Sequence, residues 1–208
     1  PETREPFLWK IFFEDLDEGS LVDSVGRFDR AEGRVRFIAP MPPRVESRSR
    51  NTSAYPLFAP MGWFAPIGSG VVVGRSDRGR FHHYAADGRL VGIIDVPMDP
   101  APIPRSAEPE ILEEFYGAVG GATLSRPRDV HHSFPVFGFM WPLPDSLFAL
   151  QQTRRSTPVG EPAIPVDQTV WRVFSIRGAY RGTIMLPLRA SLPYWVEDGR
   201  LLATRRDS

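Results

Sequence analysis

Alternation of apolar and polar positions organises this chain, and one alternating segment occurs twice. FHHYAADGRLVGIIDVP occupies 81–97, and WRVFSIRGAYRGTIMLP occupies 171–187, ninety positions later. The copies align without a gap. Because side chains alternate between the two faces of a strand, each copy predicts a β-hairpin whose turn ends at the shared glycine, Gly88 or Gly178. We expect a left-handed backbone at that glycine, since glycine adopts positive φ at little steric cost.

Apolar residues also occupy the second face of the later strand in the first copy, where Val91 and Ile93 alternate with Leu90 and Ile94. Apolar residues on both faces indicate a strand covered on both sides, as in stacked sheets. A fainter third copy, FFEDLDEGSLVDSVGRF, occupies 12–28 and has Gly19 in the place of the turn glycine. The chain is therefore predicted to repeat one β unit.

Two further strand-like segments lie before each full copy. They are an alternating segment, at 69–76 and 145–152, and an aromatic segment upstream of it, at 61–66 and 137–142. Four short antiparallel strands that recur in this order are typical of the blade of a β-propeller. We therefore expect an all-β fold, with one β-propeller segment over 1–208. Its parts are a half blade at 8–28, blades at about 58–97 and 135–187, and a half blade at 190–206.

The repeated pattern resembles bacterial six-bladed propellers of the NHL and TolB-like group. Its form is aromatic-x-x-(Tyr/Phe)-x-x-x-Gly-x-(Leu/Tyr)-x-Gly-x-Ile-x-(Leu/Val)-Pro, and an Asp-x-Leu-Phe-Ala strand precedes the second copy at 145–149. The resemblance covers most of 8–206 and implies six blades in the whole fold. Many members of the group are secreted or lipid-anchored, so it also implies an extracytoplasmic location, periplasmic or secreted.

The ends of the sequence predict that this chain is a segment of a longer propeller. It begins at Pro1 and stops at Ser208, just after the predicted half blade. A closed ring of blades needs two more strands at that point. A secretion signal is then expected upstream of this segment.

Three segments interrupt the strand pattern. The segment 29–57 is longer than a connection between blades needs, and its centre, 42–56, is polar, proline-bounded and aperiodic, which predicts a surface loop or a locally disordered one. The segment 107–118 has apolar residues at helical spacing, with Ser106 as the expected N-cap. We expect a helix inserted between blades there. A proline-rich insertion at 153–166 separates two strands of the later blade.

Composition limits the range of partners. The chain has 25 basic and 25 acidic residues, so no net field attracts nucleic acid or a membrane surface. No apolar run is long enough to span a bilayer, so no membrane-spanning segment is expected. The chain has no cysteine, which excludes disulfides and thiolate metal sites.

Five residues are candidates for ligand contact. Trp63, Trp141 and Trp195 fall in the first strand of successive blades, the strand that lines the channel of a propeller. Their recurrence favours a packing role, but these rings also form the best apolar platform for a central ligand. His131 and His132 stand just before one of these strands, on a loop that could reach the channel mouth.

The first functional hypothesis is a non-enzymatic binding or interaction scaffold. It would meet an unknown protein or small molecule at one channel face, with no catalytic residue, no metal site and no cofactor. The alternative hypothesis is a metal-dependent lactonase or related hydrolase, because the fold resembles gluconolactonase-like propellers. Those enzymes hold a divalent cation with Glu and Asn side chains. This chain has a single Asn, Asn51, in a predicted loop, which disfavours the hydrolase.

Overall fold

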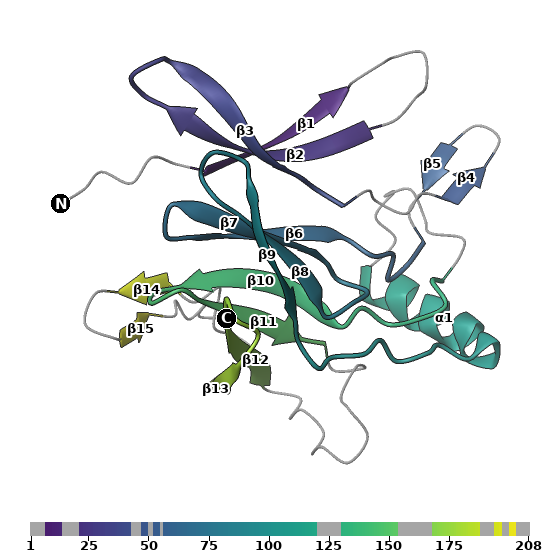
Figure 1. The fold of residues 1–208 in the computed structure, drawn as a ribbon. Helices are drawn as coiled ribbons and strands as arrows, with labels where there is room; N and C mark the ends of the chain where they lie inside the picture. Colours follow the sequence, from purple (N-terminus) through teal and green to yellow (C-terminus); the bar gives the residue numbers. More distant parts are fainter. Residues whose placement is uncertain are drawn as a thin grey trace.

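The computed structural model describes residues 7–13, 21–42, 47–49, 52–54, 56–119, 130–153, 168–187, 194–196 and 200–202. These residues form an all-β fold of antiparallel sheets with one inserted α-helix (Figure 1). The predicted fold class is confirmed at this level. No helix in the described ranges is long and apolar enough to cross a membrane.

Two four-stranded sheets, named the second and third sheets because a three-stranded sheet precedes them along the chain, form the centre of the fold. In each, every strand is hydrogen-bonded to the next strand along the chain. The second sheet contains β6 (Gly62–Ile67), β7 (Gly70–Arg75), β8 (Arg80–Tyr84) and β9 (Leu90–Asp95). The third contains β10 (Phe137–Leu143), β11 (Leu147–Gln152), β12 (Gln168–Ser175) and β13 (Tyr180–Pro187). Both sheets lie within the ranges 58–97 and 135–187, where the sequence predicts four consecutive strands.

The first sheet has one strand more than the sequence predicts. It consists of β1 (Phe7–Phe13), β2 (Leu21–Asp29) and β3 (Arg34–Pro40). The third strand, β3, lies in the segment 29–57, where the sequence predicts a connection and no strand. The centre of that segment, predicted as a loop, contains a short hairpin, β4 (Ser47–Ser49) with β5 (Thr52–Ala54). A second short hairpin, β14 (Tyr194–Val196) with β15 (Arg200–Leu202), falls in the range 190–206.

The turn glycines show where the third copy of the repeat lies. Gly88 and Gly178 have φ of 86° and 80°, which confirms the predicted left-handed turns. Gly33, with φ of 63°, lies at the same place between β2 and β3. The third copy is thus one strand later than the 12–28 alignment, whose glycine, Gly19, lies outside the described residues.

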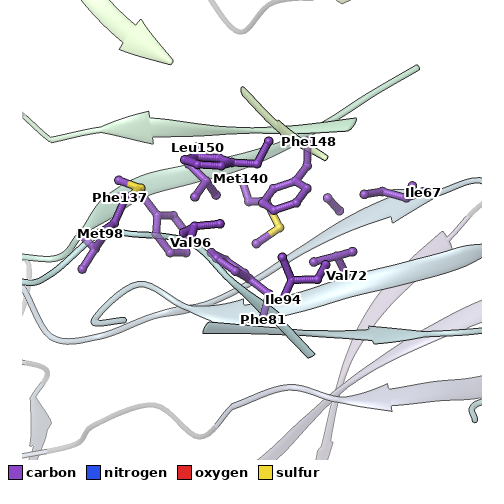
Figure 2. Packing of buried hydrophobic residues seen from close by; sticks show 13 residues of the cluster. Ile67, Val72, Phe81, Ile94, Val96, Met98, Phe137, Met140, Phe148 and Leu150 are labelled. Atoms are coloured by element: carbon purple, nitrogen blue, oxygen red, sulfur yellow. The ribbon is translucent and has the colours of Figure 1, made fainter. Parts of the chain in front are cut away.

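The second and third sheets pack face to face over the largest buried cluster, shown in Figure 2. Phe81 of β8 belongs to this cluster and is fully buried. Its ring centroid lies 5.6 Å from that of Phe137 and 5.4 Å from that of Phe148, both in the third sheet. These are the distances of favourable aromatic pairs in protein cores. Aromatic packing therefore holds the two sheets together.

Strand β7 is buried on both faces. Val71 and Val73 pack in a second cluster with Val25 of the first sheet, whereas Val72 belongs to the cluster shared with the third sheet. Successive side chains of a strand point to opposite faces. The second sheet therefore lies between the other two, an order that Figure 1 shows from purple through blue and teal to green.

Burial on both faces does not extend to β9, the outermost strand of the second sheet. Val91 and Ile93 are 50% and 55% exposed. The prediction of cover on both sides is therefore wrong at this strand. The first sheet contacts the second through β3 and β7, so the outer strand keeps one face toward solvent.

The helix predicted at 107–118 is present as α1 (Glu108–Val119). A single 3-10 turn, η1 (Arg105–Ala107), leads into it. Ser106 lies inside this turn, so the predicted N-cap is wrong: the chain enters the helix through the hydrogen bond from Ala107 N to Pro104 O, at 2.9 Å. The helix joins β9 to β10 and lies beside the ends of the sheets where β6 and β10 begin (Figure 1).

Candidate ligand-binding pocket

An apolar pocket of about 410 Å³ lies between the beginnings of β6 and β10 and the helix α1. Most of its lining is aromatic or aliphatic, and the lining in the described part of the chain carries no charged side chain. The lining residues are Pro56, Leu57, Phe58, Ala59, Pro60, Met61, Trp63, Ser76, Phe115, Pro135, Phe137 and Gly138. Four aromatic rings and one hydroxyl thus define its chemistry.

The inserted helix supplies one wall. Phe115 stands four residues after Ile111, and positions four apart lie on one face of a helix. Ile111 is buried, with 7% of its surface exposed. The face that packs against the rest of the molecule therefore also carries Phe115 to the pocket, where Trp63 of β6 forms part of the same lining.

A tight turn before β6 forms a second wall. The backbone N–H of Ala59 donates to the carbonyl oxygen of Pro56 at 3.0 Å and closes the turn. Phe58, inside it, has φ of 63°, in the left-handed region that residues with a side chain rarely adopt. Its ring meets that of Phe134 edge to face, with centroids 5.1 Å apart.

The segment before β10 anchors this turn. Leu57 forms a parallel bridge with Val130, and the N–H of His131 donates to the carbonyl oxygen of Leu57 at 2.9 Å. Pro135, further along the same segment, lines the pocket. Two stretches far apart in sequence therefore fix one wall by backbone hydrogen bonds.

Ser76 brings the one hydroxyl among the lining side chains. It follows β7 and is 2% exposed. Its Oγ accepts a hydrogen bond from Met61 N at 3.0 Å, and its N–H donates to Met61 O at 2.9 Å. Its carbonyl oxygen accepts from Val136 N at 2.6 Å. Because a serine hydroxyl both accepts and donates, the Ser76 hydroxyl still has a proton to donate while it accepts from Met61 N.

The three predicted tryptophans do not share one environment. Trp63 lines the pocket and lies against Phe139 of β10, with ring centroids 4.6 Å apart. Trp141 packs on the far face of the third sheet, against the cluster that contains Trp171. Trp195 lies in β14, where its backbone pairs with Leu201; the description does not extend to its side chain.

The stacking of the sheets explains this difference: the third sheet covers the face of the second sheet that carries Trp63, whereas Trp141 lies on the face of the third sheet that is turned away from the second. The two rings also differ in register. Trp63 pairs with Gly74, whereas Trp141 pairs with Ala149. Trp141 therefore stands two residues nearer its hairpin turn than Trp63 does. A bulge in β10 between Phe137 and Met140 shifts that strand further, and bulges re-aim the side chains around them.

The two predicted histidines lie beside the pocket but are not among its lining residues. Their rings contact each other at a tilt of 39°, with centroids 4.0 Å apart. His131 is half-buried, and its Nδ1 lies 3.1 Å from the carbonyl oxygen of Ser133, whose N–H donates to the same nitrogen at 3.3 Å. His132 is exposed. In the described ranges, no three His, Asp or Glu side chains are placed to hold a metal ion together.

Sequence reasoning selected one lining residue, Trp63, and missed Phe58, Ser76 and Phe115 as site residues. Phe115 belongs to the apolar stripe of the predicted helix, a signal of packing rather than of binding. Comparison with models of known protein families, with curated proteins and with solved structures found no match. The resemblance to six-bladed propellers therefore remains a prediction.

Proposed function

We propose that this chain is a non-enzymatic binding scaffold of the β-propeller type that holds a small uncharged molecule in the apolar pocket. The observation that carries the proposal is the pocket itself. Its volume of about 410 Å³ lies in the range of small-molecule sites, which are mostly apolar with few polar groups. Binding there buries apolar surface of the ligand, the main source of affinity in such sites.

The relation between successive sheets supports the propeller part of the proposal. Gly88, in the last turn of the second sheet, lies against Ile38 of β3, the outer strand of the first sheet. Gly178, in the last turn of the third sheet, lies against Asp95 of β9, the outer strand of the second. The same contact thus relates each sheet to the one before it. A repeated step between four-stranded sheets is how propeller blades are stacked.

The position of the pocket supports the scaffold part. Its walls come from the ends of two sheets and from the inserted helix, so the sheets provide a rigid frame and the connections provide the contacts. Ligand-contacting residues in many folds lie on connections held by such a frame. The location outside the cytoplasm and the partner protein stay predictions of the sequence resemblance.

Fluorescence titration with N-phenyl-1-naphthylamine, an uncharged aromatic dye that brightens in apolar surroundings, tests this proposal. We expect saturable binding at one site per chain. Trp63→Ala should weaken binding by about tenfold or more, because it removes a large apolar contact. Trp141→Ala is the matched control: it removes the same ring from the far face of the third sheet and should leave the affinity within about twofold. Equal losses in both variants, or no saturable binding, would contradict the proposal.

A further inference from the structure

We infer that Phe58 is the specificity-determining residue of the pocket and makes it select an uncharged, planar aromatic ligand. This inference rests on the proposed function and adds the ligand class to it. Its starting point is the backbone of Phe58, whose φ of 63° is unfavourable for a bulky residue. Strained backbone of this kind concentrates at ligand-binding sites, where the surrounding structure holds it in place.

Other positive φ values in the described chain have an ordinary explanation. Apart from glycines and Phe58, the described residues with positive φ are Asp145 and Ser146. Asp145 and Ser146 are the two central residues of the turn between β10 and β11, which the hydrogen bond from Leu147 N to Pro144 O closes at 3.1 Å. A hairpin turn of type I′ requires positive φ at both central positions. Phe58 lies in no hairpin, and glycine or asparagine would adopt its conformation at lower cost. The strain at this position therefore indicates that the ring of Phe58 has a function of its own.

The contacts of the turn fix where that ring lies. Ala59 N and Pro56 O close the turn, and Leu57 O accepts the hydrogen bond from His131 N. The edge-to-face contact with Phe134 supports the Phe58 ring from one side. Phe58 is a lining residue of the pocket, and these contacts hold its side chain in place before any ligand arrives, which lowers the entropy lost on binding.

The other lining groups define the ligand. Trp63 and Phe115 bring two further rings from β6 and α1. Tilted or edge-to-face contacts between aromatic rings contribute free energy in addition to that gained by burying the area of the rings. A charged ligand would lose its hydration in this lining without an opposite charge to replace it. Ser76 can hydrogen-bond one polar group, so the best fit is a neutral aromatic molecule with a single hydroxyl or carbonyl.

The decisive experiment compares two ligands with the same carbon skeleton, 2-naphthol and its saturated counterpart decahydro-2-naphthol, by calorimetric titration at pH 7. We expect the protein to bind 2-naphthol at least about fivefold more tightly. The charged 2-naphthoate should bind at least about tenfold more weakly than 2-naphthol. Phe58→Leu, which keeps an apolar side chain of similar size, should abolish the preference for the aromatic ligand, whereas Phe58→Tyr should retain it.

A second comparison separates binding from folding. Phe58→Gly and Phe58→Ala both remove the ring, but glycine also relieves the left-handed backbone. We expect the glycine variant to melt at a higher temperature than the alanine variant, and both to lose at least about tenfold in affinity for 2-naphthol.

Each result has a clear meaning. Equal affinity for the aromatic and saturated ligands, or an unchanged preference in Phe58→Leu, overturns the inference while the proposed pocket function stands. Binding of neither ligand by the wild-type protein overturns both. Unchanged affinity in the glycine and alanine variants would overturn the inference, because the Phe58 ring would then have a packing role alone.

Discussion

A Cβ atom on Gly178 would lie 2.6 Å from the backbone oxygen of Asp95, although the two residues belong to different sheets. Gly178 lies in the turn between β12 and β13, and Asp95 is the last residue of β9. Gly88 has the corresponding contact with Ile38 of the first sheet, at 3.3 Å. The absence of a side chain at one repeated position therefore lets each turn approach the preceding sheet.

Replacement of Gly178 should lower the free energy of unfolding more than replacement of its neighbour, Ala179. Gly178→Val combines a positive φ of 80° with a collision against backbone atoms that cannot easily move. We expect a loss of about 3 kcal/mol in the free energy of unfolding. Ala179→Val, at the exposed next residue, should change it by less than about 0.5 kcal/mol. Urea denaturation of both variants measures the difference, and coinciding midpoints would refute the contact.

The two turn glycines also predict a graded effect. Gly88→Ala meets its neighbour at 3.3 Å and Gly178→Ala at 2.6 Å, with nearly equal φ. Alanine adds the same backbone strain at both sites, so the larger loss at Gly178 reports the closer contact between sheets. A larger loss at Gly88 would contradict this interpretation.

The sequence predicted features that a single local constraint determines. The left-handed glycines were identified because a tight turn admits few other residues, and the helix because its apolar stripe repeats at helical spacing. The predicted helix, 107–118, differs by one residue at each end from the helix of the structure, 108–119. The predicted N-cap, Ser106, was wrong because a 3-10 turn precedes the helix. The side chains of 105–107 do not specify that turn.

Features that depend on contacts between distant segments were not predictable in this way. Phe58, Ser76 and Phe115 meet in one pocket from a turn, a strand end and a helix, and no pattern along the chain relates them. The aromatic residue in a left-handed turn carries no sequence signal, because glycine or asparagine is the residue type associated with that conformation. Trp63 was selected because it lies in a strand that recurs in the repeat.

Misplacement of the third copy has a similar cause. The alignment without gaps selected Gly19, since the glycine and the following leucine and valine match the pattern. The structure places Gly33 at the turn, in a sheet whose third strand the sequence assigned to a connection. Strand register depends on pairing with neighbours, and that information is absent from a short alternating segment.

A further prediction concerns the aromatic rings of the core. Gly74 of β7 pairs directly with Phe81 of β8, and a Cβ atom there would overlap the Phe81 ring. Gly74→Ala should displace the ring from Phe137 and Phe148 and destabilise the protein by about 1–3 kcal/mol. Thermal melting with circular dichroism measures the loss.

Gly92 is the matched control for this substitution. It also lies in a strand of the second sheet, but a Cβ atom there would have no atom within 4 Å from any residue beyond its two chain neighbours. Gly92→Ala should leave the stability unchanged or raise it by up to about 1 kcal/mol, because alanine restricts the unfolded chain. In Gly74→Ala with Phe81→Leu, the smaller side chain should make the two losses less than additive. Additive losses would place the cause of the Gly74 effect elsewhere.

The last prediction concerns acid stability and the ion pair between Arg75, the last residue of β7, and Asp77. Arg75 Nε donates to Asp77 Oδ1 at 2.7 Å, and Arg75 Nη2 donates to Asp77 Oδ2. The two side chains are 21% and 15% exposed. Burial raises the pKa of Asp77, but the hydrogen bonds and charges of Arg75 and Arg78 outweigh it and hold that pKa below its ordinary value of 3.8.

A carboxyl group whose pKa is lower in the folded state stabilises the protein above its unfolded pKa, and this contribution disappears as the pH falls through the folded value. Asp77→Asn should therefore destabilise the protein at pH 6–7, by on the order of 1.5 kcal/mol. Its melting temperature should converge with that of the wild type as the pH falls below 3.8. Asp95→Asn is the control, since it breaks an ion pair with Arg80 whose side chains are 57% and 62% exposed. Exposed pairs contribute about 0–1 kcal/mol, so this variant should follow the wild type throughout. A constant difference between Asp77→Asn and the wild type from pH 7 to pH 3 would show that Asp77 acts through its shape and not through its charge.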